Sequence, residues 1–191
     1  MRLFFAIEIP PDLVARVSAV QAELGALMPD PGIRWTRPEN LHYTLKFLGE
    51  LPVQRAYRAV EVAQDIARAR RPFELTIGGV GVFPNPQRPN VLWIGATAGR
   101  DELIGLAREL DNALARERFR RETKEPKAHL TLARIKTYDA EVAVSAKLDR
   151  VKVGDVGTFT PHHMVLMQSV LTPTGSNYTV VERFRFEGGA E

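Results

Sequence analysis

The sequence contains no cysteine among its 191 residues. This absence excludes disulfide bonds, a thiolate nucleophile and any metal site built on cysteine ligands. The sequence also has no apolar run of membrane-spanning length, and Pro10, Pro11 and Asp12 follow the first apolar segment too early for a secretory signal. We therefore expect a cytoplasmic protein whose chemistry depends on other side chains.

Charge of one sign is not in large excess either. Lys and Arg total 26 and Asp and Glu total 23, which gives a formal net charge of +3. So small an excess permits an anionic ligand but does not identify one. The length and the average apolar content predict a single domain over residues 1–191, which we expect to be a monomer without an obligatory protein partner.

Hydrophobic periodicity predicts an α/β protein. Strands are expected at residues 3–9, 33–35, 41–48, 73–82, 91–96, 129–135, 151–160, 164–171 and 178–186, and helices at residues 12–27, 54–71, 101–118 and 140–148. Short links between the later strands favour antiparallel pairing. The order of elements is similar in the two halves of the chain, which indicates two related lobes that face each other.

The pattern HxTL occurs twice, at residues 42–45 and at residues 129–132. Both copies lie in predicted strands, where successive side chains alternate between faces. The histidine and the threonine of each copy therefore point to the same side. If the two strands face each other, one cleft contains His42, Thr44, His129 and Thr131.

Two imidazoles and two hydroxyls suit the hydrolysis of a cyclic phosphodiester. A base must take a proton from water while an acid protonates the departing sugar oxygen, and imidazole can do either near neutral pH. The threonine hydroxyls can donate hydrogen bonds to the non-bridging phosphate oxygens. We expect neither a metal nor another cofactor.

Two other interpretations of the histidines compete with this one. An isolated histidine in a strand is more often a hydrogen-bonded residue of the core, but the recurrence of the whole motif argues against that interpretation. A zinc site would need a third histidine, carboxylate or cysteine ligand at local spacing, and neither motif supplies one.

With both motifs in view, the chain resembles the two-histidine (2H) phosphoesterase superfamily, and more closely its RNA 2′,3′-cyclic phosphodiesterase branch, long called 2′-5′ RNA ligase. The resemblance extends over nearly the whole chain and rests on the segments RLFFAIEIP, RWTRPENLHYTLKFLGE, GVGVFPNPQRPNVLWIGA, HLTLARIK and SVLTPTGSNY. It implies a bilobal fold in which two mainly antiparallel sheets flank a central cleft, with the helices outside.

The resemblance also implies an activity, the hydrolysis of RNA 2′,3′-cyclic phosphate ends to 2′-phosphomonoesters without a metal. Carried over by motif, His42 is the general acid toward the 3′ oxygen and His129 is the general base toward water. Thr44, Thr131 and Arg134 contact the phosphate. Strand alternation alone places Arg134 on the face opposite His129, so a twist, a bulge or a strand end is needed to bring it to the phosphate.

One segment departs from the family pattern. Residues 126–128 read Pro-Lys-Ala, whereas relatives have an aromatic residue, a basic residue and a proline directly before the second histidine. The family's substrate contacts from this loop are therefore not carried over to this chain.

Basic and aromatic residues near the motifs could bind RNA. The basic residues are Arg34, Arg37 and Lys46 near the first motif and Arg116, Arg118, Arg120, Arg121, Lys124 and Lys127 near the second. A solvated surface explains any single one of them equally well. Trp35, Phe47, Phe83 and Trp93 are candidates for stacking on a terminal base, but strand alternation turns Phe47 away from His42 and predicts that it packs in the core.

Other functions fit the same pattern. The same fold could act on a nucleotide cyclic phosphate, act on 2′-5′ linkages, or run the reaction backwards as a ligase. The chain could also belong to a different functional class, as a non-catalytic RNA-binding module whose histidines only hydrogen-bond to phosphate, although two intact motifs argue against this.

Overall fold

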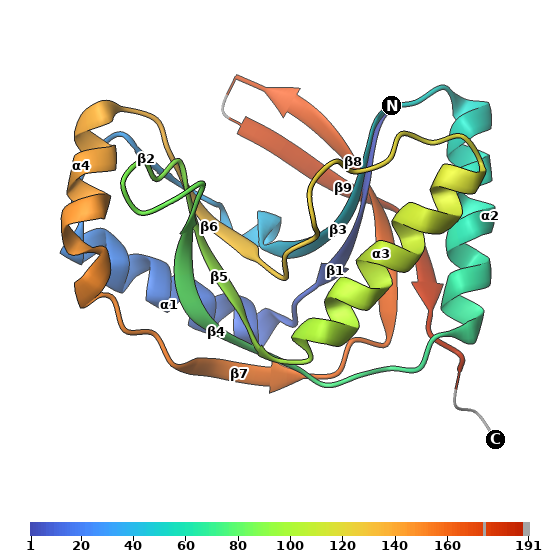
Figure 1. Ribbon diagram of the computed structural model, residues 1–191, viewed down its shortest axis with the longest axis horizontal. Coiled ribbons are helices and arrows are strands. Elements are labelled where there is room, and N and C mark those ends of the chain that lie inside the picture. The colour runs from blue at the N-terminus through green and yellow to red at the C-terminus, as the bar shows by residue number, and fades with distance from the viewer. Residues whose placement is uncertain (174, 189–191) are drawn as a thin grey trace.

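A computed structural model describes residues 1–173 and 175–188 of the chain (Figure 1). Thr174, within the segment SVLTPTGSNY, and residues 189–191 lie outside the described part. The described elements follow in the order β1 (Arg2–Glu8), α1 (Pro11–Leu27), β2 (Ile33–Trp35), η1 (Pro38–Asn40), β3 (His42–Glu50), α2 (Val53–Ala69), β4 (Leu75–Phe83), β5 (Val91–Ala98), α3 (Arg100–Arg116), β6 (Leu130–Ile135), α4 (Tyr138–Lys147), η2 (Leu148–Arg150), β7 (Asp155–Phe159), β8 (His163–Thr172) and β9 (Gly175–Arg185). The predicted order of helices and strands is confirmed.

The strands form one sheet in the order β7-β4-β5-β6-β3-β1-β8-β9, with β2 paired to β6 beside this path. The described strand pairs are antiparallel. The fold class is thus confirmed as α/β with mainly antiparallel strands. The two expected sheets are the two halves of this sheet, and they join where Tyr43 of β3 pairs with Leu130 of β6.

The helices lie outside the two halves of the sheet (Figure 1). Helices α2 and α3 pack against each other, and they contact β8, β9 and β3 of one half. Helix α1 contacts β7 of the other half, where α4 also lies. Each half therefore has its own layer of helices, and the residues of the two motif strands lie at the seam between the halves.

Helix α2 forms because small apolar residues recur at helical spacing. Ala59, Ala63, Ile66 and Ala67 lie along one buried stripe, and the helix ends before Pro72, which cannot continue it. Alanine side chains keep this stripe thin, so α2 can pack closely on α3 and the sheet.

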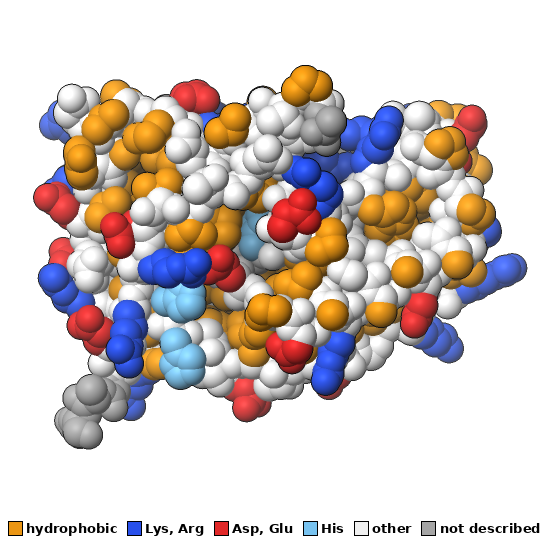
Figure 2. All heavy atoms as spheres, turned by 180° about the vertical axis from the view of Figure 1, so that it is seen from behind, with side chains coloured by type: hydrophobic (Ala, Val, Ile, Leu, Met, Phe, Trp, Pro, Cys, Tyr) orange, Lys and Arg blue, Asp and Glu red, His pale blue; other side chains and the backbone are white. Residues whose placement is uncertain are grey.

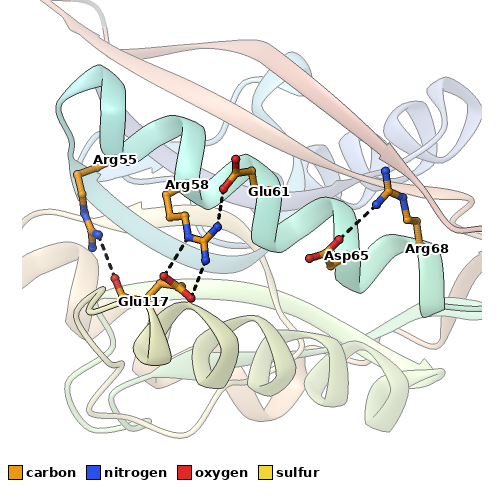
Figure 3. Close-up of polar contacts among 6 residues, drawn as sticks. All are labelled: Arg55, Arg58, Glu61, Asp65, Arg68 and Glu117. Atoms are coloured by element: carbon orange, nitrogen blue, oxygen red, sulfur yellow. Dashed lines mark hydrogen bonds and ion pairs between the residues drawn. The ribbon is translucent and has the colours of Figure 1, made fainter.

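An arginine pair on α2 fixes the end of α3 (Figure 3). Arg58 donates hydrogen bonds to the carboxylates of Glu117 and Glu61, and Arg55 donates to the backbone oxygen of Glu117. The Arg55 guanidinium also lies 3.9 Å from the centre of the Phe119 ring. These contacts set the starting point of the segment that leads from α3 to the second motif.

Candidate active site

The two HxTL motifs lie side by side in antiparallel register. Tyr43, the second residue of the first motif, pairs with Leu130, the second residue of the other motif. This is the one residue pair described between β3 and β6; continued by one step in either direction, the same register would set His42 beside Thr131 and Thr44 beside His129. The arrangement is a local two-fold, and in a regular ladder diagonal neighbours such as the two histidines lie about 7–8 Å apart.

Both imidazoles are oriented by the same kind of hydrogen bond. Nδ1 of His42 lies 2.8 Å from the backbone oxygen of Asn40, and Nδ1 of His129 lies 2.9 Å from that of Lys127. A carbonyl oxygen can only accept, so Nδ1 carries the proton in both rings. In the neutral form, the lone pair is therefore on Nε2, which is the atom left to exchange a proton with a ligand.

The first threonine is bonded directly to its histidine. Nε2 of His42 lies 3.0 Å from Oγ1 of Thr44. Thr44 and His129 also line a cavity of about 490 Å³, together with Phe47 and Phe83. Figure 2 shows a histidine side chain within a hollow near the middle of one face of the molecule. A ligand in this cavity thus meets groups from both motifs.

Burial lowers the pKa of both histidines. The pKa of His42 falls to about 4 because the ring is desolvated, although its bond to Asn40 opposes the shift, and a positive charge on His129 would lower it further. Burial also lowers the pKa of His129, its bond to Lys127 opposes this, and the charge of Arg134 adds to the lowering. Both rings are therefore neutral near pH 7 in the free protein, and each lies within electrostatic reach of the other.

A bulge in β6 turns Arg134 to the side of the motif threonine. Trp93 of β5 pairs with Thr131, whereas the preceding residue of β5, Leu92, pairs with Ala133. Leu132 is the extra residue, and it and Ala133 are both buried while Arg134 is exposed. The simple alternation of faces is wrong beyond this point, because a bulge reverses which residues face the core.

A second bulge, at the equivalent place in β3, corrects the prediction for Phe47. Phe5 pairs with Lys46 and Ala6 with Thr44, so Leu45 is the extra residue. Phe47 is 58% exposed rather than packed in the core. Phe47 and Arg134, each five residues after a motif histidine, are thus brought to the open side of their strands by matching bulges.

Lys46 is not part of a basic rim, contrary to the expectation from its position. Its side chain is 2% exposed, and its ammonium lies 2.7 Å from Asp111 and 3.6 Å from Glu122. It also donates to the backbone oxygen of Arg120. Although burial acts the other way, the hydrogen bond from Lys46 keeps the pKa of Asp111 below its usual value. Lys46 therefore fixes the loop after α3 against the first motif strand.

Arg37 is also engaged within the protein. Its guanidinium donates to the backbone oxygen of Ser176 and to the side-chain oxygen of Asn177, at 2.7 and 2.6 Å. The Asn40 side chain donates to the same oxygen of Ser176. These bonds tie the turn before His42 to the β8–β9 hairpin, so Arg37 holds the first motif in place rather than presenting a free charge.

The other three candidate aromatic residues differ in their positions. Trp35 is partly buried and lies beside Gly25 of α1, in the core. Trp93 contacts Phe83, with the ring centres 5.2 Å apart, and Phe83 meets His129 edge-on at 4.9 Å. Phe83 and Trp93 thus form one wall of the site, whereas Trp35 packs against the core.

Three residues of the site were not predicted from the sequence. Phe4 and Tyr178 lie 5.0 and 5.3 Å from the His42 ring, centre to centre, and 5.0 Å from each other, so the three rings form one cluster. Gln21 of α1 donates at 2.9 Å to the backbone oxygens of Thr36 and Leu132, so it braces the β6 bulge. Phe4 lies in the continuous apolar run of β1, and nothing in that run distinguishes it from its neighbours as a contact of His42. Helical spacing assigns Gln21 to α1 but does not indicate which groups its side chain bonds to.

Among the described residues, no group of three or more His, Asp or Glu side chains is placed to hold a metal ion. The helices of the described part are also too short or too polar to cross a membrane.

Comparison with known proteins assigns the chain to the same kind of family as the two motifs do. The profile of the family "LigT like Phosphoesterase" matches residues 7–93 and 94–173, and each matched segment contains one motif. The chain belongs to the LigT-like phosphoesterase family. The expected resemblance to 2H phosphoesterases is therefore confirmed, and so is the expectation of an enzyme of this family.

Other LigT-like phosphoesterases match over most of their length. The RNA 2′,3′-cyclic phosphodiesterase of Archaeoglobus fulgidus is 36% identical, with 93% of this chain and 96% of the relative covered. The protein of that name from Methanothermobacter thermautotrophicus is 34% identical, with 97% and 98% covered. Their names describe those proteins, and they match this chain through both lobes.

Solved structures confirm the fold. The protein TT0787 of Thermus thermophilus superposes with a TM-score of 0.82 at 30% identity, covering 99% of this chain and all of that one. LigT of E. coli, in complex with 3′-AMP, superposes with a TM-score of 0.77 at 25% identity, covering 97% of both chains.

Proposed function

We propose that this LigT-like phosphoesterase opens 2′,3′-cyclic phosphates at RNA ends and leaves a 2′-phosphomonoester. The observation that carries the proposal is the antiparallel register of Tyr43 and Leu130, which sets two equivalent His-Thr pairs around one position. A phosphorus atom held there has an imidazole Nε2 on either side. One ring can act on the attacking water while the other acts on the leaving oxygen.

Two proton transfers accompany the opening of the ring. Water attacks phosphorus and gives a proton to Nε2 of His129, while the bond from phosphorus to O3′ breaks. O3′ takes a proton from Nε2 of His42, which must be protonated when substrate binds. A cyclic phosphate is an anion, so its presence between the rings favours the imidazolium that burial disfavours in the free protein. The reaction needs neither a metal nor a cofactor.

Thr44, Thr131 and Arg134 hold the phosphate in this proposal. In the register each threonine lies beside the histidine of the opposite motif, and its hydroxyl can donate to a non-bridging oxygen beside the reacting atoms. The Thr44 hydroxyl donates to Nε2 of His42 while that ring is neutral, and protonation of the ring frees it to donate to the phosphate. Arg134 supplies a positive charge near enough to His129 to lower the pKa of that ring. A fixed cation is suited to the charge that grows on the non-bridging oxygens as water attacks.

Three features support an RNA end as the substrate. Relatives of 34–36% identity carry the name RNA 2′,3′-cyclic phosphodiesterase, and the E. coli structure of the same fold contains 3′-AMP. The exposed ring of Phe47 borders the cavity that contains Thr44 and His129. An exposed aromatic face beside a phosphate site can stack on the base of the terminal nucleotide. We propose that the two lobes of one monomer suffice for this activity.

One assay tests the proposal directly. The purified protein is incubated with an oligoribonucleotide ending in a 2′,3′-cyclic phosphate, with and without EDTA, and the product is analysed by ³¹P NMR. We expect a 2′-phosphomonoester at the same rate in both samples. A 3′-phosphate would overturn the assignment of the leaving oxygen, and loss of activity with EDTA would overturn the metal-free mechanism. Joined RNA ends would indicate a ligase, and binding without any product would indicate an RNA-binding module.

A further inference from the structure

Arg34 and Arg134 are directly opposite each other on neighbouring strands. Arg34 of the short strand β2 pairs with Arg134 of β6 in antiparallel register, so both side chains project from the same face of the sheet. Both residues are exposed. Ile33 is buried on the other face of β2 and Trp35 packs there too, which is consistent with Arg34 pointing out of the core.

This arrangement brings two positive charges together without an acidic partner. Like charges directly opposite in a sheet destabilise the fold. Among the ion pairs and hydrogen bonds of the described residues, none involves the side chain of Arg34 or of Arg134. In contrast, Arg37 near the first motif is engaged within the protein. An anion between the two guanidinium groups would remove the repulsion.

The position of the pair along β6 indicates which anion it takes. Arg134 is three residues beyond Thr131 on β6, and with a rise of about 3.3 Å per residue and one bulged residue this is roughly 7–10 Å. One nucleotide of an RNA chain spans such a distance. Arg34 lies on β2, which carries no motif and pairs only with β6 among the described strands. Arg34 is therefore one strand further from the motif histidines than Arg134.

We propose that Arg34, together with Arg134, forms a second phosphate subsite that binds the backbone phosphate joining the terminal nucleotide to the rest of the RNA. Arg134 lies between the two phosphates, and Arg34 contacts only the second one. The subsite rests on the proposed function for the identity of the RNA end. It makes the enzyme prefer an oligonucleotide end over a free nucleotide cyclic phosphate, because only the former has a phosphate there.

A comparison of two substrates tests the subsite. The substrates are adenosine 2′,3′-cyclic phosphate and the dinucleotide ApA with a 2′,3′-cyclic phosphate end. We expect the wild-type protein to have a lower KM for the dinucleotide than for the mononucleotide. Arg34→Gln should raise the KM for the dinucleotide about tenfold and leave kcat nearly unchanged. The ratio of the two KM values then approaches one. An unchanged ratio in Arg34→Gln would overturn the proposal.

A matched variant controls for the loss of a positive charge. Arg68 lies on the outer helix α2, where it pairs with Asp65 (Figure 3). Arg68→Gln removes the same charge away from the motifs, and we expect the KM ratio to change less than twofold. Because Arg34→Gln removes a like-charge contact, its melting temperature should not fall. A matching change of the ratio in both variants would mean a general electrostatic effect and would overturn the subsite.

A binding measurement separates this proposal from the proposed function. His129→Ala protein, with or without Arg34→Gln, is titrated with a fluorescent oligoribonucleotide ending in a cyclic phosphate at several salt concentrations. Losing one phosphate contact should reduce the slope of log K against log salt by about 0.7. The two proposals fail on different results. If the wild-type protein turns over neither substrate, the proposed function is wrong. If His129→Ala with and without Arg34→Gln gives the same slope of log K against log salt, the Arg34 subsite is wrong.

Discussion

Tyr43 and Leu130 are paired across the seam of the sheet, and each is the middle residue of a His-x-Thr triplet. The Tyr43 side chain is fully buried, and its hydroxyl donates to the backbone oxygen of Gly95 on β5 at 2.7 Å. The residue between His42 and Thr44 is therefore anchored in the core of the opposite lobe. This anchor fixes how the first motif strand meets the second.

The lowered pKa values of the two histidines predict the pH dependence. The active form needs one protonated and one neutral ring, and burial brings the pKa of His42 to about 4 and lowers that of His129 below 6.5. Because burial lowers both pKa values, we expect the maximum of kcat/KM below pH 6.5, with a decline as the pH rises further. The anionic substrate raises both pKa values, so the maximum of kcat should lie at higher pH. Initial rates over pH 4–9 check this, and a kcat/KM maximum above pH 6.5 would contradict it.

Phe47 is predicted to act on substrate binding. In Phe47→Ala, loss of the stacking surface should raise the KM for a cyclic-phosphate dinucleotide about tenfold or more, because stacking on an aromatic ring contributes about 1–3 kcal/mol per base. Phe47→Tyr keeps the ring and should stay close to wild type. Tyr57→Ala, which removes an exposed ring from helix α2, serves as the control. An equal KM in Phe47→Ala and Tyr57→Ala would refute a stacking role.

Lys46 is predicted to be required for stability because its charge is buried among acids. Lys46→Met removes the ammonium and leaves Asp111 without its cation, which should lower the free energy of unfolding by roughly 3 kcal/mol. Adding Asp111→Leu removes the unpaired carboxylate and should recover part of the loss. Urea denaturation of both single variants and the double variant measures this coupling. Additive losses in the double variant would show that the two residues do not act as a buried pair.

Gln21 is predicted to act through Arg134, because it braces the bulge that turns this arginine. Gln21→Met fills similar space but cannot donate to Thr36 or Leu132, and we expect about a tenfold fall in kcat/KM. The same change in an Arg134→Ala background should cost much less, since residues that act through one another are not additive. Equal effects of Gln21→Met in the two backgrounds would mean that Gln21 supports the fold alone.

The sequence was sufficient to predict the helices, the strands and both motifs, because apolar periodicity and a repeated HxTL pattern are local signals. It was not sufficient to predict the sides that Phe47 and Arg134 take. Alternation was extended through Leu45 and Leu132, where the chain bulges. The β6 bulge is braced by a partner distant in sequence, since Gln21 bonds to Leu132, and a period-two pattern carries no trace of such a partner.

The burial of Lys46 has a similar cause. A lysine two residues after a candidate catalytic threonine indicates a basic rim when it is considered alone. Its acidic partner Asp111 is on α3, and the carbonyl of Arg120 comes from the loop beyond that helix. Only the packing of α3 on β3 shows that the charge is neutralised. Likewise, Arg34 gains its proposed role only from its pairing with Arg134.

The central claim is that His42 and His129 act together on one phosphorus atom. Its most direct test is the turnover of a cyclic-phosphate dinucleotide by His42→Ala, His129→Ala and the double variant, with melting temperatures measured alongside. We expect each single change to lower kcat about 10²–10⁴-fold in a folded protein, and the double change to cost little more, because the two rings serve one step. Full activity in either single variant, or losses that multiply in the double variant, would contradict this claim.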